Sequence, residues 1–400
     1  MKTIHYREIS GRSPAFYVFM VTLLIFIGAG LASAHYMESH GHHVTGMTNQ
    51  IVWGIPHVFA IFMILSASGA LNVASISSVF DRGLYKPLAR LSGLLAITLL
   101  AGGLSTLVLD LGRPDRLIVA MTTYNFRSIF AWNIFLYTGF FAVVVIYLWF
   151  MMEPRMNAYV KPAGFFAFFW RLTLTTGTGS IFGFLVAREA YNSAVMAPMF
   201  ILMSFLFGLA VFMLFLMATF WLTQRPLGDE VVRRLKNLLG VFIASVLYFV
   251  MVYHLTNIYI AQRRGIEEFI LLHGGVYTAL FWIGQILIGS IVPLVLVYHP
   301  WFRRSRPLIA LAAALVVIGG FIQLYVIIIG GQAYPLVLFP GKIVSSSFYD
   351  GVINTYTPSV FEIALGLGTT ALSIFLASIA IKVLPFLPET LADNPADSVQ

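Results

Sequence analysis

Long apolar runs, separated by short polar segments, follow one another along the whole chain. Each run reaches the roughly 20 residues that an α-helix needs to cross the hydrocarbon core of a membrane. None shows the short alternating pattern of a membrane β-barrel strand. The pattern therefore predicts about ten transmembrane helices, at 14–34, 51–80, 88–110, 128–152, 163–187, 195–223, 237–261, 269–298, 307–330 and 359–384.

The composition excludes a water-soluble protein. Hydrophobic residues make up 59% of the 400 residues and charged residues only 10%, whereas about a quarter of a soluble domain is charged. The chain has no cysteine, so it can hold no disulfide, iron–sulfur cluster or thiolate metal site of its own. We therefore predict an all-α integral membrane protein that forms one polytopic domain over residues 1–400.

The basic residues predict an orientation. The net charge of +8 does not indicate nucleic acid as a partner, because the basic residues lie in short loops between the apolar runs. If successive loops alternate sides, 17 of the 24 Lys and Arg residues lie on the side of the N-terminus. The positive-inside rule then places both termini in the cytoplasm, for a multi-pass protein of the inner (cytoplasmic) membrane. The longest outer connection, 331–358, is predicted to be a lid or a docking surface.

Ionisable residues within the apolar runs gather near the outer face. An ionisable group inside a bilayer costs several kcal/mol, so each one needs a reason. The outer positions predicted to be polar are His57, Asp110, Asn133, Arg188, Glu189 and, in the second half, His254, His273 and Glu362. For the groups at helix ends, capping is an alternative interpretation. His57 lies deeper, so it needs an internal hydrogen-bond partner or a ligand.

Haem and metal are two other ligands that these residues could bind. Histidines on facing helices could bind haem, but haem-binding bundles usually repeat the histidine pair at two depths, and here the histidines share one depth. The outer segment with His35, Glu38, His40, His42 and His43 could bind a metal, although a solvated or partner-facing loop explains it better. We predict neither haem nor metal in this chain.

The run 163–187 is unusually polar. Arg171 is its one cation in the inner half, and Thr175 and Thr178 belong to a series of hydroxyl side chains interleaved with glycines. Small and hydroxylated residues permit close helix packing. The same residues could instead line a proton path from Arg171 toward Arg188 and Glu189.

One motif resembles a known family. Asp110-Leu111-Gly112-Arg113-Pro114-Asp115-Arg116 follows the third predicted helix; Gly112 and Pro114 predict a tight turn, and Arg113 or Arg116 can pair with Asp110. At the outer end of a transmembrane helix, this string resembles the hallmark of the NrfD/PsrC family of haem-free membrane subunits of respiratory complexes. The stretches 42–62 and 124–133 look most like the DsrP-type subunit of the Dsr membrane complex of sulfur metabolism.

The resemblance implies quinone chemistry and a particular architecture. It implies two four-helix bundles, at 51–187 and 195–330, with the first and tenth helices peripheral. It also implies a quinone or quinol cofactor (menaquinone or ubiquinone) that reacts near the outer face. Electrons would be exchanged with an extracytoplasmic ferredoxin-like iron–sulfur subunit, and a multihaem cytochrome c and other membrane subunits would complete the complex.

Quinol oxidation releases protons, so the site needs proton acceptors. Imidazole changes its charge near neutral pH, which suits His57 to this role. The residues predicted to be catalytic are His57, Asp110 and Arg113, and those predicted to bind the quinone ring are Trp53, Phe59, Tyr124, Trp132 and Asn133.

The predicted function is that of a haem-free, quinone-interacting subunit that works only within a larger oxidoreductase complex. Coupling to proton movement through 163–187 is left open. A proton or ion conductor is the first alternative, but it would need acidic residues throughout the membrane depth. A passive membrane anchor is the second alternative, and it gives no reason for His57 at its depth.

Overall fold

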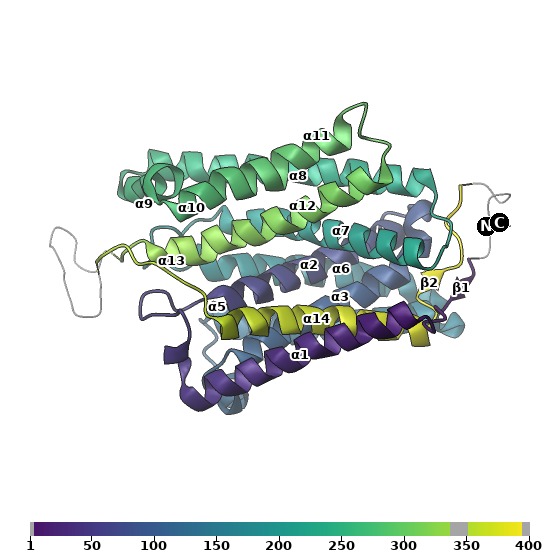
Figure 1. Cartoon of the computed structure of the whole chain (residues 1–400), viewed down its shortest axis with the longest axis horizontal. Helices are drawn as coiled ribbons and strands as arrows, with labels where there is room; N and C mark the ends of the chain where they lie inside the picture. The colour runs from purple at the N-terminus through teal and green to yellow at the C-terminus, as the bar shows by residue number, and fades with distance from the viewer. Residues whose placement is uncertain (1–3, 337–350, 394–400) are drawn as a thin grey trace.

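The computed structural model describes residues 4–336 and 351–393 as a set of long, roughly aligned helices (Figure 1). A two-residue strand near each end of the chain completes the structure, and the two strands pair antiparallel, with Tyr6 opposite Pro388. The elements are β1 (Tyr6–Arg7), α1 (Pro14–His40), α2 (Ile55–Ser78), α3 (Ala89–Leu109), α4 (Leu117–Thr122), α5 (Ile129–Met152), α6 (Val160–Gly183), α7 (Met196–Leu222), α8 (Asp229–Tyr259), α9 (Arg264–Glu268), α10 (Val276–Ala279), α11 (Val292–Tyr298), α12 (Arg306–Tyr325), α13 (Gly331–Ala333), α14 (Val360–Val383) and β2 (Leu387–Pro388).

Within the described residues, nine helices are long and apolar enough to cross a membrane. The run 163–187 folds as the 24-residue helix α6, which is not among those nine. Arg171, the threonines and the glycines of α6 account for its lower hydropathy. The predicted all-α integral membrane fold is thus confirmed. A tenth crossing and the placement of both termini in the cytoplasm stay predictions.

Helix α2 lies at the centre of the molecule and is almost entirely buried. It packs against α3 and α6, and α5 completes this group by packing against both of them. In a second group, α7 packs against α8 and α12, and the α10–α11 helix packs against α12 and α8. Helices α1 and α14 pack on each other, outside α3 (Figure 1). Helix α7 also packs closely against α2 and α6 of the first group, so the predicted division at 51–187 and 195–330 stays a prediction.

Three π-helical segments interrupt the second group. Within the described chain they are Phe269–His273, Leu280–Ile291 and Val326–Gly330. The second one joins α10 to α11, and the third joins α12 to α13. A π-turn widens a helix locally and is found often at functional sites.

Several predicted helix boundaries were wrong. Helix α1 continues to His40, beyond its predicted end at residue 34. Helix α6 ends at Gly183, so Arg188 and Glu189 lie in the connection to α7. Helix α8 begins at Asp229, because Asp229 and Glu230 are favoured in the first turn by the helix dipole. His273 precedes the helix that begins at Val276, because Gly275 adopts a φ of +58° and ends the preceding turn.

Half of the predicted lid or docking surface at 331–358 falls on residues 337–350, which lie outside the described residues. Gln332 of α13 is fully buried, and Tyr356, which precedes α14, is 8% exposed. Val352 and Ile353, by contrast, are exposed.

Candidate functional site

A buried carboxylate at the end of α3 lies between two histidines. The side chain of Asp110 is 2% exposed, and its Oδ2 lies 3.2 Å from Nδ1 of His57 in the first turn of α2. That contact has ion-pair distance but not hydrogen-bond alignment, so in the described structure both carboxylate oxygens and His57 Nδ1 lack a hydrogen bond. The His57 side chain is 26% exposed. Its imidazole can therefore meet a ligand while the carboxylate stays buried.

The second histidine is His42, from the segment between α1 and α2. Its Nε2 lies 2.9 Å from the main-chain oxygen of Asp110 and 4.0 Å from Oδ1. A carbonyl oxygen only accepts hydrogen bonds, so the proton of neutral His42 lies on Nε2. Three sequence-distant segments thus meet at Asp110, and two of them bring an imidazole.

Asp110 takes this position because α3 ends there. Its main-chain N–H closes the last turn on Thr106, and the Gly112–Pro114 turn then leads the chain outward. That turn contradicts the predicted pairing of Arg113 with Asp110. Arg113 lies at the surface and donates two 3.0 Å hydrogen bonds to Asp115, which lower the pKa of the Asp115 carboxyl.

Trp53 supplies an aromatic wall beside His57. The two rings stack with their centroids 6.1 Å apart. Phe130 from α5, Phe182 from α6 and Tyr191 lie around the same indole, at 5.6–6.4 Å. The imidazole of His57 thus adjoins a cluster of aromatic rings centred on Trp53, of which Phe130 is exposed.

The main chain at Trp53 is held by the second helix group. The Gln332 side chain is fully buried and accepts hydrogen bonds from the N–H groups of Val52 and Trp53. It also donates to the Trp53 carbonyl. Arg188 donates to the carbonyls of Gln50 and Gln332, and burial lowers the pKa of its guanidinium.

The remaining residues predicted to bind the quinone do not gather at His57. Phe59 meets Phe321 of α12 at 4.7 Å, and Tyr124 lies against Phe126 and Phe135. The exposed Trp132 donates to the Phe126 carbonyl. Asn133 donates to the Gly177 carbonyl and thereby ties α5 to α6. Their recorded contacts are thus with residues other than His57 and Trp53, which depth along the sequence alone does not reveal.

The predicted path along α6 is made of separate local contacts. Arg171 is completely buried, and its Nη2 donates to Asn72 of α2 at 2.9 Å. The Thr175 hydroxyl donates to the main chain of its own helix. Thr178 lies 3.2 Å from the Tyr137 hydroxyl. Glu189 lies beyond the helix end, where burial raises its pKa and Arg263 partly offsets that rise.

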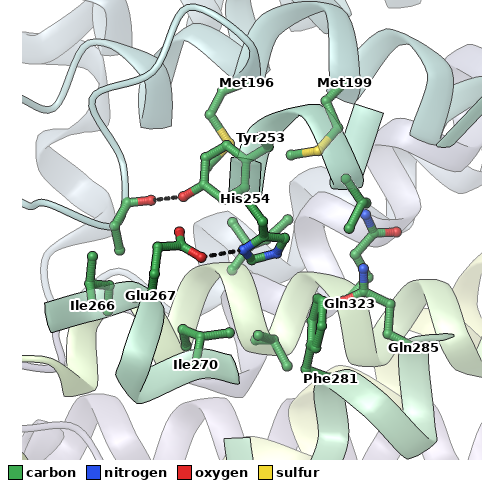
Figure 2. Close-up of a pocket in the computed structure, with 15 residues that line it drawn as sticks. Met196, Met199, Tyr253, His254, Ile266, Glu267, Ile270, Phe281, Gln285 and Gln323 are labelled. Carbon is green, nitrogen blue, oxygen red and sulfur yellow. Dashed lines mark hydrogen bonds and ion pairs between the residues drawn. The ribbon is translucent and has the colours of Figure 1, made fainter. Parts of the chain in front are cut away.

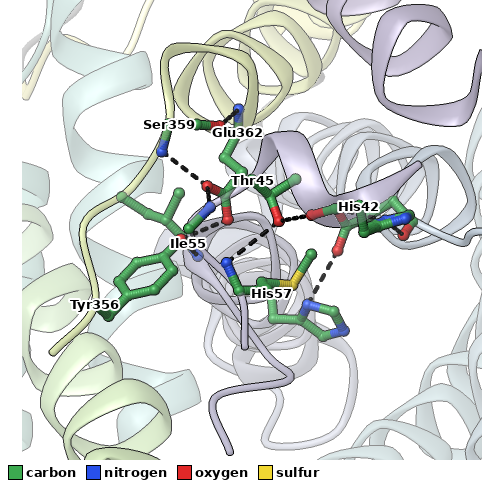
Figure 3. Close-up of polar contacts among 10 residues, drawn as sticks. His42, Thr45, Ile55, His57, Tyr356, Ser359 and Glu362 are labelled. Atoms are coloured by element: carbon green, nitrogen blue, oxygen red, sulfur yellow. Dashed lines mark hydrogen bonds and ion pairs between the residues drawn. The ribbon is translucent and has the colours of Figure 1, made fainter. Parts of the chain in front are cut away.

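Glu362 is a structural cap and does not belong to a polar layer of the second group. Its carboxylate accepts hydrogen bonds from the Tyr356 hydroxyl and from the N–H groups of Gly46 and Ser359 (Figure 3). Burial, followed by the bond to Glu362, raises the pKa of Tyr356, so this phenol stays a donor. The capping alternative is the one that fits the geometry of Glu362.

His254 has a partner that sequence reasoning missed. Its Nδ1 lies 2.6 Å from Oε2 of Glu267, which is 4% exposed and comes from the short helix α9 (Figure 2). His273, predicted to share this layer, is exposed at the surface. The spacing of 13 residues between His254 and Glu267 spans a helix end, so no helical periodicity relates them.

The residues missed at the first site are His42, Gln50, Tyr191 and Gln332. His42 belongs to a histidine-rich segment whose pattern favours a solvated loop. The one feature of the sequence that could have indicated His42 as a site residue is its proximity to the predicted outer face. Gln332 gave no signal, because a glutamine near a helix end is ordinary.

Together, the fold and this site define a polytopic helical membrane protein with a histidine–carboxylate pair at one end of its first helix group. A family model described as polysulphide reductase, NrfD, matches residues 43–335. The chain therefore belongs to the NrfD family, as the DLGRPDR motif indicates. The narrower likeness to DsrP-type subunits stays a prediction.

Relatives cover nearly the full length of the chain. An Hdr-like menaquinol oxidoreductase integral membrane subunit of Archaeoglobus fulgidus is 28% identical, over 98% of both chains. A subunit of the selenate reductase of Mesobacillus selenatarsenatis is 25% identical, over 91% of this chain and 93% of the relative. A menaquinone reductase integral membrane subunit of Nitratidesulfovibrio vulgaris is 22% identical, over 94% and 92%.

Proposed function

We propose that this chain is the quinone-interacting membrane subunit of a respiratory oxidoreductase complex, with its quinone site at His57. The observation that carries the proposal is the buried His57–Asp110 pair, with its partly exposed imidazole beside Trp53. Two relatives named for menaquinol or menaquinone support the ligand class, and menaquinone is our first choice over ubiquinone.

The residues present fit a quinone. Such a ligand needs a flat apolar slot and a hydrogen-bonding group at a ring oxygen. The proposed position of the ring is against Trp53 and the exposed Phe130, beside His57. The carboxylate oxygens of Asp110, which have no hydrogen bond within the described structure, keep a charge available to the imidazole. A bound quinol supplies two electrons and two protons.

Each residue at the site has a defined task. His57 accepts a proton at the site, and the Asp110 carboxylate stabilises the imidazolium that results. His42 donates a hydrogen bond from Nε2 to the main-chain carbonyl of Asp110 and so helps to hold the carboxylate beside His57. Gln332 and Arg188 hold the main chain of residues 50–53 and so keep Trp53 in place.

The proposed complex follows the predicted orientation. The site lies at the end of the helices opposite β1 and β2, which is the extracytoplasmic end if both termini are cytoplasmic. We propose a ferredoxin-like iron–sulfur subunit there as the electron partner, with a multihaem cytochrome c among the further subunits. Each of these relatives is named as a subunit of an oxidoreductase or reductase, which supports a multi-subunit assembly.

Variants of the pair test this proposal in the intact complex, by quinol oxidation and by binding of a quinone analogue. We expect His57→Gln and Asp110→Asn to lower turnover at least about 100-fold, since a positioned acid–base group contributes about 10²–10⁴ in rate. The matched control is His273→Gln, an exposed histidine of the second helix group. Turnover equal to that of the control, in a fully assembled complex, would refute the site.

A further inference from the structure

The second helix group contains a cavity that the proposed quinone site does not use. Its volume is about 40 Å³. Met196 and Met199 of α7 lie on one side, and Ile270 and Phe281 lie on another (Figure 2). The titratable residues in its lining are Tyr253, His254 and Glu267. The space is too small for a quinone ring, but it suits about three water molecules.

Gln323 and His254, two polar residues of the cavity lining, each have a nitrogen that can still form a hydrogen bond. Gln323 of α12 is 3% exposed, and within the described structure its Nε2 has no hydrogen-bond partner. Figure 2 shows its side chain at the cavity. An amide donor buried without an acceptor costs about 1–3 kcal/mol. A bound water molecule that accepts from Gln323 removes that cost.

The geometry at His254 determines which ring nitrogen is free. Nδ1 and Glu267 Oε2 are 2.6 Å apart, so a proton must lie between them, because two lone pairs would repel each other at that distance. Asn257 donates to the other oxygen of Glu267 at 2.8 Å and holds the carboxylate in place. Neutral His254 therefore presents Nε2 as an acceptor, to which water can donate.

All three π-helical segments of the described chain contribute to this lining. Ile270 comes from Phe269–His273, Phe281 and Gln285 come from Leu280–Ile291, and Val326 and Ile327 come from Val326–Gly330. A π-turn sacrifices regular hydrogen bonding, so its recurrence around one cavity indicates a function there. Simple packing would not require three of them.

We propose that this cavity is a second functional site, where bound water links Gln323 to His254 and the His254–Glu267 pair exchanges a proton. The proton comes from the outer aqueous phase. It forms an N–H bond at Nε2 of His254, and the Glu267 carboxylate balances the imidazolium charge.

A chain of contacts leads from the pair toward the outer surface. Arg263 donates to Asn257 at 2.9 Å and to the main chain of Asn192. Tyr253 donates its proton to the Ala190 carbonyl and is thereby engaged elsewhere. The charged groups that face the pair are thus Arg263 and, beyond it, Glu189. The site is independent of the quinone chemistry proposed at His57.

Infrared difference spectra between two pH values test the site, with the full chain in lipid nanodiscs and no quinone added. We expect a histidine signal that is absent in His254→Gln. We also expect a water signal that shifts in isotopically labelled water. Gln323→Leu should remove the water signal, whereas the matched control Gln262→Leu, at an exposed position, should retain it.

The unbranched Gln323→Met variant repeats the test if Gln323→Leu does not fold. A water signal that survives in a folded Gln323 variant would overturn the hydrated cavity. A histidine signal that survives in His254→Gln would overturn the proton exchange. His57→Gln should leave both signals unchanged, so failure at one site is distinguishable from failure at the other.

Discussion

At the scale of single residues, the number of partners distinguishes structural charges from reactive ones. The Glu362 carboxylate receives three hydrogen bonds and is satisfied. The Asp110 carboxylate meets two imidazoles and, in the described structure, receives no aligned hydrogen bond on its side chain. A buried charge whose oxygens accept no hydrogen bond is costly, and such groups concentrate at functional sites.

Variants at Arg171 and its partner can show whether this buried charge contributes to the stability of the fold. The Nη2 of Arg171 bonds to Asn72, whereas Nε and Nη1 have no hydrogen-bond partner in the described structure. The guanidinium also lies 4.8 Å from the ring centroids of Phe168 and Phe205. Asn72→Ala should lower the free energy of unfolding by about 1.5–3 kcal/mol, because it removes a hydrogen bond from a buried cation.

The double variant Asn72→Leu with Arg171→Met should recover that loss, since an apolar pair replaces a buried charge at little cost. Thermal unfolding in detergent measures both variants. A double variant as unstable as Asn72→Ala would show that the guanidinium itself stabilises the fold.

At the scale of helices, close contacts between glycines join the two helix groups. Gly69 of α2 lies directly against the main chain of Ser204 in α7, and Gly208 of α7 lies against Gly69 and Ala70. A side chain at either position would meet backbone, which cannot move aside as a flexible side chain can. Such small-residue contacts permit helices in membranes to approach closely.

Gly69→Ala and Gly208→Ala should each lower the stability by at least about 1–3 kcal/mol, because the added carbon forces α2 and α7 apart. Gly28→Ala on α1 is the matched control, since no atom from another described helix or loop lies within 4 Å of a carbon added there. The melting temperature and the yield of folded protein measure the difference. Equal values for Gly69→Ala and Gly28→Ala would contradict this packing.

At the scale of the whole molecule, Arg225 joins the two ends of the chain at the face opposite His57. From the α7–α8 connection it donates to the main-chain oxygens of Arg7, Glu8, Leu387 and Pro388, at 2.9–3.3 Å. The side chain of Asp393 accepts from the first N–H groups of α8. These contacts hold β1, β2 and α8 together (Figure 1).

Arg225→Ala should release both chain ends, because one guanidinium serves carbonyls from both of them. We expect faster hydrogen exchange over residues 5–9 and 386–393, together with a lower melting temperature. Arg304→Ala, at an exposed arginine of the same face, serves as the control. If exchange at the two ends stays at the wild-type rate, the Arg225 contacts do not retain them.

Most of the fold could be predicted from hydropathy, and the reason is physical. A lipid-embedded helix must be apolar over a fixed length, so nearly every membrane-spanning helix corresponds to a recognisable apolar run in the sequence. The run 163–187 was also detected, although Arg171 and its hydroxyl side chains make α6 the least apolar of the set. The boundaries were less accurate, since charged first turns and glycine breaks lie outside the apolar core.

By itself, the sequence determined the helical membrane fold, the family motif and the location of His57 and Asp110 near the same end of their helices. Tertiary structure alone decided the partners: His42 for Asp110, Glu267 for His254, Tyr356 for Glu362 and Asp115 for Arg113. Depth along a helix follows from counting residues, because the rise per residue is constant. The direction in which a side chain points, and what it meets there, depends on how separate helices and loops pack, which the order of residues along one helix does not specify.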